Sequence, residues 1–236
     1  MKKILIFTGA GVSKESGIET FRDSKDGLWN NYKVEDVATI DAWGKNRELV
    51  LDFYNQRRSQ LKDVEPNLAH KLIADLEKGF EVTLVTQNVD NLHERAGSKN
   101  VIHLHGELTQ SRSTFPGSTQ SYYCPDDINI GDKCPRGAQL RPNIVWFGEN
   151  LDANNIAMAE DSAIKCDICI IVGTSMQVFP ANQIPFLTKE DCIIFYVDPS
   201  EMDFYVPEFR SEFFHHIKEP ATKGMQKLID IFKQVK

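Results

Sequence analysis

The chain has 236 residues, 41% of them hydrophobic and 26% charged, and its 27 basic against 34 acidic side chains give a net charge of −7. This length and composition are typical of one sizeable globular domain. The negative charge argues against a general binder of nucleic acids or anionic membranes, because phosphate contacts need a clustered positive surface. It does not exclude a small anionic cofactor.

The N-terminal run and the cysteines bear on the cellular compartment. Apolar residues 4–7 form a run that is too short for the core of a signal peptide. No run approaches the roughly 18 apolar residues of a membrane span. Five cysteines without a regular framework fit reduced thiols. We therefore expect a cytoplasmic protein without a membrane anchor.

The first predicted strand, residues 4–7, leads directly into the glycine turn Gly9-Ala10-Gly11. Glycines permit positive φ and let a pyrophosphate approach the backbone, and a helix that follows offers N–H groups to it. An ordinary glycine turn is the alternative interpretation. The next glycine is Gly17, so the spacing is not that of hydride-transferring dinucleotide enzymes. More polar and aromatic groups follow than a packing helix needs: Ser13, Ser16, Phe21 and Arg22.

Residues 23–29 form a polar loop, which is either a lid over the cofactor or a plain surface loop. Helical spacing of apolar residues then predicts a helix within residues 46–62, and a second helix from Pro66 to Gly79. A buried strand follows at residues 80–86.

Polar side chains follow this strand, namely Gln87, Asn88 and Asp90. The carboxyl ends of parallel strands point into the ligand crevice of an open α/β sheet, so we expect these residues to line a site. The next predicted strand, residues 101–105, ends in His105. Taken alone, this residue is either a functional histidine or a hydrogen-bonded structural one.

From residue 107 to 139 the periodic pattern breaks down, and we expect the chain to rejoin the sheet at residues 140–149. The later elements are a helix at 154–165, a strand at 166–172 that leads into Gly173-Thr174-Ser175, a strand at 193–197 and a helix at 223–236. Alternating strands and helices predict an α/β fold with a Rossmann-like, doubly wound parallel sheet.

The whole chain, residues 1–236, is predicted to form a single catalytic domain. Its Rossmann-like part would comprise about residues 1–23, 68–106 and 140–236. Two insertions, residues 24–67 and 107–139, would build a small module.

Five blocks of the sequence resemble the sirtuins, the Sir2 family of NAD-dependent protein deacylases: GAGVSKESGIETFR, TQNVDNLHERAG, HLHGEL, RPNIVWFGE and GTSMQVFPA. The resemblance implies that the oxygen of an acyl-lysine displaces nicotinamide from the ribose of NAD, with His105 and Asn88 as catalytic residues. His105 would deprotonate a ribose hydroxyl, a task suited to an imidazole. The products would be free lysine, nicotinamide and O-acyl-ADP-ribose.

The resemblance also implies residues that contact the cofactor. Gln87 and Asn88 would hold the ribose and a water, and Asp90 the nicotinamide carboxamide. Phe21 would shield the pocket and Arg22 would line it. The remaining cofactor residues would be Gly9, Ala10, Gly11, Ser13, Gly17, Gly173, Thr174, Ser175, Asp198 and Ala221. Asp198 departs from the family, where an asparagine is common.

An acylated lysine peptide is the implied substrate. Val145, Phe147, Gly148 and Glu149 resemble the segment that pairs with an extended peptide, although a buried strand is an alternative. Tyr54 and Arg57 lie at i, i+3 and so share a helix face. They are either a packed tyrosine beside a solvated arginine or the Y-x-x-R signature of class III sirtuins.

A guanidinium can hold the carboxylate of succinyl- or malonyl-lysine with two hydrogen bonds. We therefore predict desuccinylation and demalonylation beside deacetylation. An NAD glycohydrolase or ADP-ribosyltransferase with the same pocket is the alternative, and a non-catalytic sensor is a third possibility.

Sirtuins typically carry two C-x-x-C pairs that bind zinc, whereas this chain has Ser113 and Pro116, then Cys134 and Gly137, with an off-pattern Cys124. Two thiolates do not make a four-ligand site, so we predict no structural zinc and no metal ligands. Aromatic side chains would pack the module instead: Phe115, Tyr122 and Tyr123.

The other C-x-x-C, Cys166 and Cys169, falls in a predicted strand. Its two side chains point to opposite faces, so we expect two buried small hydrophobes and no disulfide.

Overall fold

The computed structural model describes residues 1–18 and 32–234. Its large sheet has six parallel strands in the order β3-β2-β1-β7-β8-β9. These are β1 (Lys3–Thr8), β2 (Glu81–Thr86), β3 (Val101–His103), β7 (Ile168–Val172), β8 (Ile193–Val197) and β9 (Phe214–Ile217). The predicted α/β class with a doubly wound parallel sheet is confirmed. Strand β9 was not predicted.

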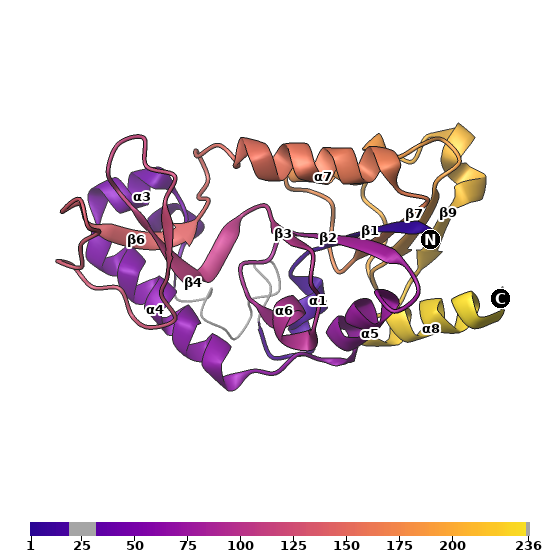
Figure 1. The fold of residues 1–236 in the computed structure, drawn as a ribbon, viewed down its shortest axis with the longest axis horizontal. Coiled ribbons are helices and arrows are strands. Elements are labelled where there is room, and N and C mark those ends of the chain that lie inside the picture. The colour runs from indigo at the N-terminus through magenta and orange to yellow at the C-terminus, as the bar shows by residue number, and fades with distance from the viewer. Residues whose placement is uncertain (19–31, 235–236) are drawn as a thin grey trace.

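Helices cover both faces of this sheet (Figure 1). Ile4 and Ile6 of β1 pack with helices α5 and α8, whereas Leu5 and Phe7 pack with α7 and the 3₁₀ helix η2. Alternate residues of a strand point to opposite faces, so a strand covered on both sides must be apolar throughout. The four helices are α5 (Leu68–Leu76), α8 (Ala221–Gln234), α7 (Ala153–Lys165) and η2 (Ala181–Leu187).

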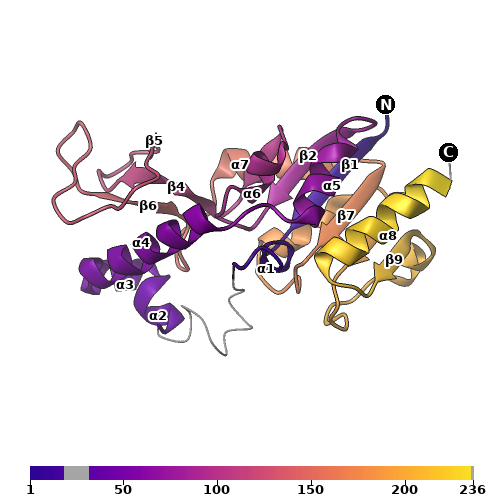
Figure 2. The same cartoon turned by 90° about the horizontal axis from the view of Figure 1, so that it is seen from below.

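A small module lies beside the large sheet (Figures 1 and 2). Its antiparallel sheet has the order β5-β4-β6. The elements are α2 (Val34–Val37), α3 (Ile40–Lys45), α4 (Arg47–Asp63), β4 (Gly106–Ser113), β5 (Ser121–Tyr123) and β6 (Leu140–Ile144). Three short helices complete the described chain, namely α1 (Gly11–Lys14), α6 (Leu92–Ala96) and η3 (Glu208–Phe213).

The expectation that residues 140–149 rejoin the large sheet is wrong. Strand β6 pairs with β4 in the small sheet, and Ile144 and Trp146 are buried in the core of the module. A short apolar run predicts a strand but not the sheet to which the strand belongs. The chain enters the module at Gly106, where φ is +82° and a Cβ would lie 1.9 Å from the carbonyl oxygen of Asn143. Only glycine fits this crossing.

The two cysteines of the C-x-x-C pattern are buried, as predicted, but they do not lie on opposite faces of one strand. Cys166 ends α7 and precedes β7, and both cysteines belong to the same apolar core. Cys166 and Cys169 are 1% and 0% exposed and form no disulfide. The sulfur nearest to Cys166 belongs to Cys192, at 3.6 Å. This contact and, after it, burial raise the pKa of the Cys166 thiol, which keeps it protonated.

Candidate active site

The two predicted glycine turns meet at the carboxyl ends of β1 and β7, where the strand order reverses direction. The Gly11 N–H donates to the Gly173 carbonyl oxygen at 2.8 Å, and a Cβ on Gly11 would lie 2.8 Å from Gly173 Cα. The Gly9 N–H donates to Val172. At these glycines the crevice is therefore lined by backbone atoms without side chains, and the N–H groups of Gly9 and Gly11 are already hydrogen-bonded within the chain.

Ser13 is the centre of a buried polar network at this edge. Its hydroxyl donates to Asp90 Oδ2 at 2.9 Å and accepts from Asn88 Nδ2 at 3.1 Å. Ser13, Asn88 and Asp90 are 0%, 7% and 6% exposed. Burial raises the pKa of Asp90, while hydrogen bonds from the Leu92 N–H and from Ser13 oppose this shift. The structure thus brings together three residues that the sequence placed in one site.

Two buried histidines support this network and were not predicted. The Nδ1 atom of His70 accepts from the Asn67 N–H, so Nε2 carries the proton of the neutral ring and faces Ser13 Oγ at 3.4 Å. Burial lowers the pKa of His70 to about 4. The His93 ring lies 4.8 Å from that of His70, and burial lowers its pKa too. A sequence signal existed, because His70 falls at i−3 from the buried Ile73.

Threonine hydroxyls fix the backbone of the same loop. Thr8 Oγ1 donates to Thr86 Oγ1 at 2.8 Å, and the Asn88 N–H donates to Thr86 Oγ1 at 3.0 Å. His93 Nε2 lies 3.0 Å from Thr8 Oγ1. The ends of β1 and β2 are therefore tied together directly beneath Asn88.

His105 lies between β3 and β4 and is half-buried. Its Nδ1 donates to the Gln87 carbonyl oxygen at 3.0 Å, so in the neutral ring the lone pair is on Nε2. Burial lowers the pKa of His105, with the Gln87 carbonyl opposing, so the ring is neutral at pH 7. The His105 carbonyl accepts from the Val145 N–H at 2.9 Å, which joins the histidine to the segment expected to bind the peptide.

The opposite side of the crevice is organised around Thr174. Its hydroxyl accepts from Gln87 Nε2 at 3.0 Å, and Tyr196 donates to its carbonyl oxygen at 3.1 Å. Asp198 is buried and accepts from the Ser200 N–H at 2.9 Å. Ala221 is buried in the apolar core at the start of α8.

The other cofactor candidates are more peripheral or lie outside the described residues. Gly17 is exposed after α1, with φ +94°, and its carbonyl accepts from Gln60. Ala10 lies between the two glycines of the first turn, and Ser175 follows Thr174. Phe21, Arg22 and the loop at 23–29 lie outside the described residues.

The two residues of the Y-x-x-R pattern project from α4. Tyr54 is 2% exposed, and its hydroxyl accepts from Trp146 Nε1 at 2.9 Å. Burial raises its pKa to about 12, so the phenol keeps a proton that it can donate. Arg57 is half-buried, with its guanidinium 5.9 Å from the Phe53 ring centre. Burial lowers the pKa of Arg57, and the nearby Tyr54 and Asp90 raise it.

The segment after β6 is held by charge. The Glu149 carboxylate accepts from Arg112 at 2.7 Å, from Arg141 at 2.6 Å and from the Trp146 N–H at 3.0 Å. Arg141 also lies 3.8 Å from the Trp146 ring centre. Glu149 therefore braces the loop that contains Phe147 and Gly148.

The Phe147 backbone is already paired within the chain. Its N–H donates to Ala38 at 3.0 Å, and its carbonyl accepts from the Ile40 N–H at 3.2 Å. The Phe147 side chain is 54% exposed. Its ring is thus the part of this residue that is open to a peptide.

A family model described as Sir2 family matches residues 9–180. An NAD-dependent protein deacylase of Helicobacter pylori strain 26695 is 46% identical over 230 residues, which cover 97% of this chain and 96% of the relative. The chain belongs to the Sir2 family. A Bacteroides thetaiotaomicron protein of the same name is 44% identical, with 97% of each chain covered. This Sir2 protein is accordingly an NAD-dependent protein deacylase.

Solved Sir2 structures share its fold. A Sir2 homolog–NAD complex matches with a TM-score of 0.86 and 38% identity, covering 99% of this chain and 90% of that chain. A Sir2–p53 peptide–NAD⁺ complex matches with a TM-score of 0.78 and 28% identity, covering 98% and 93%. The first neighbour holds the cofactor, and the second also holds a peptide.

The stretch where Sir2 proteins carry zinc ligands is held here by other contacts. Ser113 Oγ donates to Cys134 Sγ at 3.1 Å and accepts from the Phe115 N–H at 3.0 Å. The hydrogen bond from Ser113 lowers the pKa of Cys134. Arg136 lies 3.7 Å from the Phe115 ring centre. Tyr123 is 80% exposed, so the prediction that it packs the module is wrong.

Among residues 1–18 and 32–234, no group of three or more His, Cys, Asp or Glu side chains is placed to hold a metal ion. No helix within the same residues is long and apolar enough to cross a membrane.

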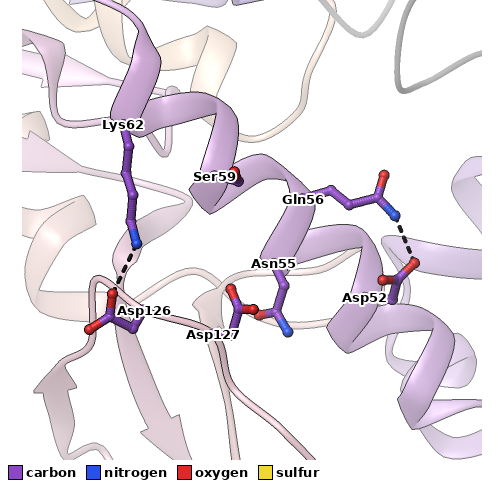
Figure 3. A pocket seen from close by; sticks show the side chains of 7 residues that line it. All are labelled: Asp52, Asn55, Gln56, Ser59, Lys62, Asp126 and Asp127. Carbon is purple, nitrogen blue, oxygen red and sulfur yellow. Dashed lines mark hydrogen bonds and ion pairs between the residues drawn. The ribbon is translucent and has the colours of Figure 1, made fainter.

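A polar pocket of about 560 Å³ lies between α4 and residues 126–127 (Figure 3). Its lining comprises Asp52, Asn55, Gln56, Ser59, Lys62, Asp126 and Asp127. Lys62 pairs with Asp126 at 2.9 Å, and Gln56 donates to Asp52 at 2.7 Å. None of the predicted site residues lines this pocket.

Proposed function

We propose that this Sir2 protein removes succinyl, malonyl and acetyl groups from protein lysine side chains in the cytoplasm, with free lysine, nicotinamide and O-acyl-ADP-ribose as products. The observation that carries the acyl preference is the placement of Tyr54 and Arg57 on one face of α4, with Arg57 in electrostatic range of Asp90. A carboxylate on the acyl chain would meet a phenolic donor and a guanidinium together.

The donor set at the crevice fits NAD. A backbone floor at Gly11 and Gly173 leaves room for a pyrophosphate, and the polar network around Ser13 offers amide and carboxyl groups to ribose and carboxamide. When bound, NAD supplies the ribose carbon from which nicotinamide leaves and the hydroxyl that receives the acyl group.

The protein residues orient this chemistry and move one proton. Asp90 is fixed by Ser13 and the Leu92 N–H, so it can hold a carboxamide in one orientation. Asn88 is held at its side chain and its N–H. His105 takes the proton of the ribose hydroxyl at Nε2, because Nδ1 is committed to the Gln87 carbonyl.

The acylated peptide would lie along the segment that starts at Val145. The Val145 N–H is bonded to the carbonyl of His105, so a peptide at this segment lies next to the base. The exposed Phe147 ring would contact the peptide, and the Glu149 network would hold the segment in place.

The acyl preference is tested with peptides that carry succinyl-, malonyl-, acetyl- or unmodified lysine, following nicotinamide and free lysine. We expect Arg57→Met to reduce kcat/KM for the succinyl peptide at least about tenfold more than for the acetyl peptide, since a charge-assisted bidentate contact is lost. Arg47→Met is the matched control, because Arg47 is an exposed arginine at the start of the same helix.

Equal losses on both peptides would refute the carboxylate clamp. Nicotinamide release from NAD without any peptide would instead support the glycohydrolase alternative. ADP-ribose transfer to protein would support a transferase.

A further inference from the structure

Two histidines, His103 at the end of β3 and His105 two residues later, bind two consecutive backbone carbonyls. The ladder between β2 and β3 ends with the pair Thr86 and His103, followed by the Leu104 N–H bonded to the Thr86 carbonyl. After this point the carbonyls that follow β2 are bound by side chains instead of backbone N–H groups. His103 Nδ1 donates to the Asn88 carbonyl oxygen at 3.0 Å, as His105 Nδ1 does to Gln87.

The strand alternation explains why both rings face the loop. Ile102 and Leu104 are 4% and 1% exposed and pack in the core beneath α7. The side chains of His103 and His105 therefore both point to the opposite side, away from this core.

The two rings differ at Nε2. His103 Nε2 lies 2.7 Å from Glu94 Oε1 of α6. An ionised carboxylate can only accept, so His103 needs protons on both nitrogens to serve both oxygens. His105 Nε2 has no hydrogen-bond partner within residues 1–18 and 32–234. The first ring is thus a charged clamp, and the second is a neutral base.

The surroundings favour the charged form of His103. Burial alone would lower its pKa, but the hydrogen bond and charge of Glu94, the charge of Glu107 and the Asn88 carbonyl raise it above the ordinary value. Asp90 and His93 also lie in electrostatic range. From α7, the neutral Asn155 amide donates to the His103 carbonyl.

We propose that His103, charged and held by Glu94, is a positioning residue that fixes the Asn88 carbonyl and thereby aims the Asn88 side chain at the cofactor. Asn88 is then held at three points: its N–H by Thr86, its side chain by Ser13 and its carbonyl by His103. A neutral His103 has one N–H and must release either Asn88 or Glu94. This role rests on the proposed function of Asn88.

Two matched variants distinguish the loss of the hydrogen-bond donor to Asn88 from a general structural effect of replacing His103. In His103→Asn the new amide nitrogen would stand near the present position of Nδ1, so this variant keeps the donor to Asn88. Glutamine places its amide farther out, so His103→Gln loses that donor. We expect His103→Gln to lower kcat about tenfold, the effect of one lost charge-assisted hydrogen bond, with an unchanged KM for the peptide. His103→Asn should restore most of the loss. His215→Gln, at an exposed histidine of β9, is the control.

The pH profile tests the charge. In the wild type, kcat should fall on the alkaline side as His103 loses its second proton. In Glu94→Gln this limb should weaken, since a glutamine amide can donate to Nε2 of a neutral ring while Nδ1 keeps Asn88.

Nitrogen NMR of the free protein gives a readout without activity. At pH 7 both ring nitrogens of His103 should be protonated and only Nδ1 of His105. A neutral His103 at pH 7, or a His103→Gln variant with wild-type kcat at every pH, would refute the positioning role. A wild type that releases no nicotinamide with any peptide would refute the proposed function, while the NMR result would still decide the charge of His103.

Discussion

The cofactor edge of the large sheet and the small module are held together by different kinds of contact. At the cofactor edge, apart from the pair of His103 and Glu94, neutral groups are buried and bonded to one another, as in the Ser13–Asn88 and Thr8–Thr86 contacts. In the module, charged groups do the same work, as in the Glu149 network and the Arg136–Phe115 stack. Hydrogen bonds between buried neutral groups determine which atom carries each proton. Ion pairs determine the position of a loop. The first property suits proton transfer, and the second suits substrate placement.

The largest effect should come from the base at the junction of the two parts. His105→Ala should lower the formation of free lysine by at least about 10²-fold, because the proposed function assigns the hydroxyl proton to His105. In the wild type, activity should fall with decreasing pH through a pKa below the ordinary value of 6.5, since the base must be neutral. Product analysis from pH 5 to 8 measures both. An acid limb centred above 6.5 would contradict the neutral-burial argument.

Next in size is the ionic brace of the module. Glu149→Gln should cost about 3 kcal/mol of unfolding free energy, because it leaves buried Arg141 without its carboxylate. Asp126→Asn removes a solvent-exposed pair with Lys62 and should cost at most about 0.5 kcal/mol. Urea unfolding of both variants gives the contrast. Equal losses of unfolding free energy in the two variants would show that the buried ion pairs do not stabilise the module more than an exposed pair does.

A pH effect on stability should arise at the cofactor edge. The pKa of His70 is about 4 in the folded chain against 6.5 for the unfolded residue, so the unfolded state binds the extra proton first. Stability should therefore fall as the pH drops from 6.5 to 4, by about 3 kcal/mol from this residue, and then level off. Unfolding of His70→Gln across this range should show a shallower slope. An unchanged slope would mean that His70 is charged in the fold.

The smallest effects should come from the stretch without zinc ligands. Ser113→Ala should cost about 1 kcal/mol, because Cys134 and the Phe115 N–H lose their common partner. A strong chelator should leave the melting temperature unchanged, as the prediction of no structural zinc requires. Stoichiometric zinc in a metal assay would overturn that prediction.

The large sheet was predictable because its strands carry a strong local signal. Runs such as residues 168–172 are apolar throughout, and the residues after β1, β2 and β7 are polar or glycine. Since parallel strands end at one edge, topology predicted that the residues after β2 line a site, and the family resemblance added Gly173 to that site.

The module and the supporting histidines were less predictable. Strand β6 has the same local pattern whether it joins one sheet or the other, and only its partner decides. Strand β9, with its sequence FHHI, lacks a hydrophobic pattern. His70 and His103 act through contacts with distant residues, which spacing along the chain does not reveal.

The register between β4 and β6 also bears on how this chain could be engineered. Gly106 and Ile144 face each other in the ladder, so the chain leaves and re-enters the active-site edge at neighbouring points. For the large sheet, the intervening residues are equivalent to the loop of a long hairpin. The entropy of closing a loop grows only slowly with its length, so a graft at these two positions could exchange the small antiparallel sheet of β4, β5 and β6 while the cofactor site stays whole.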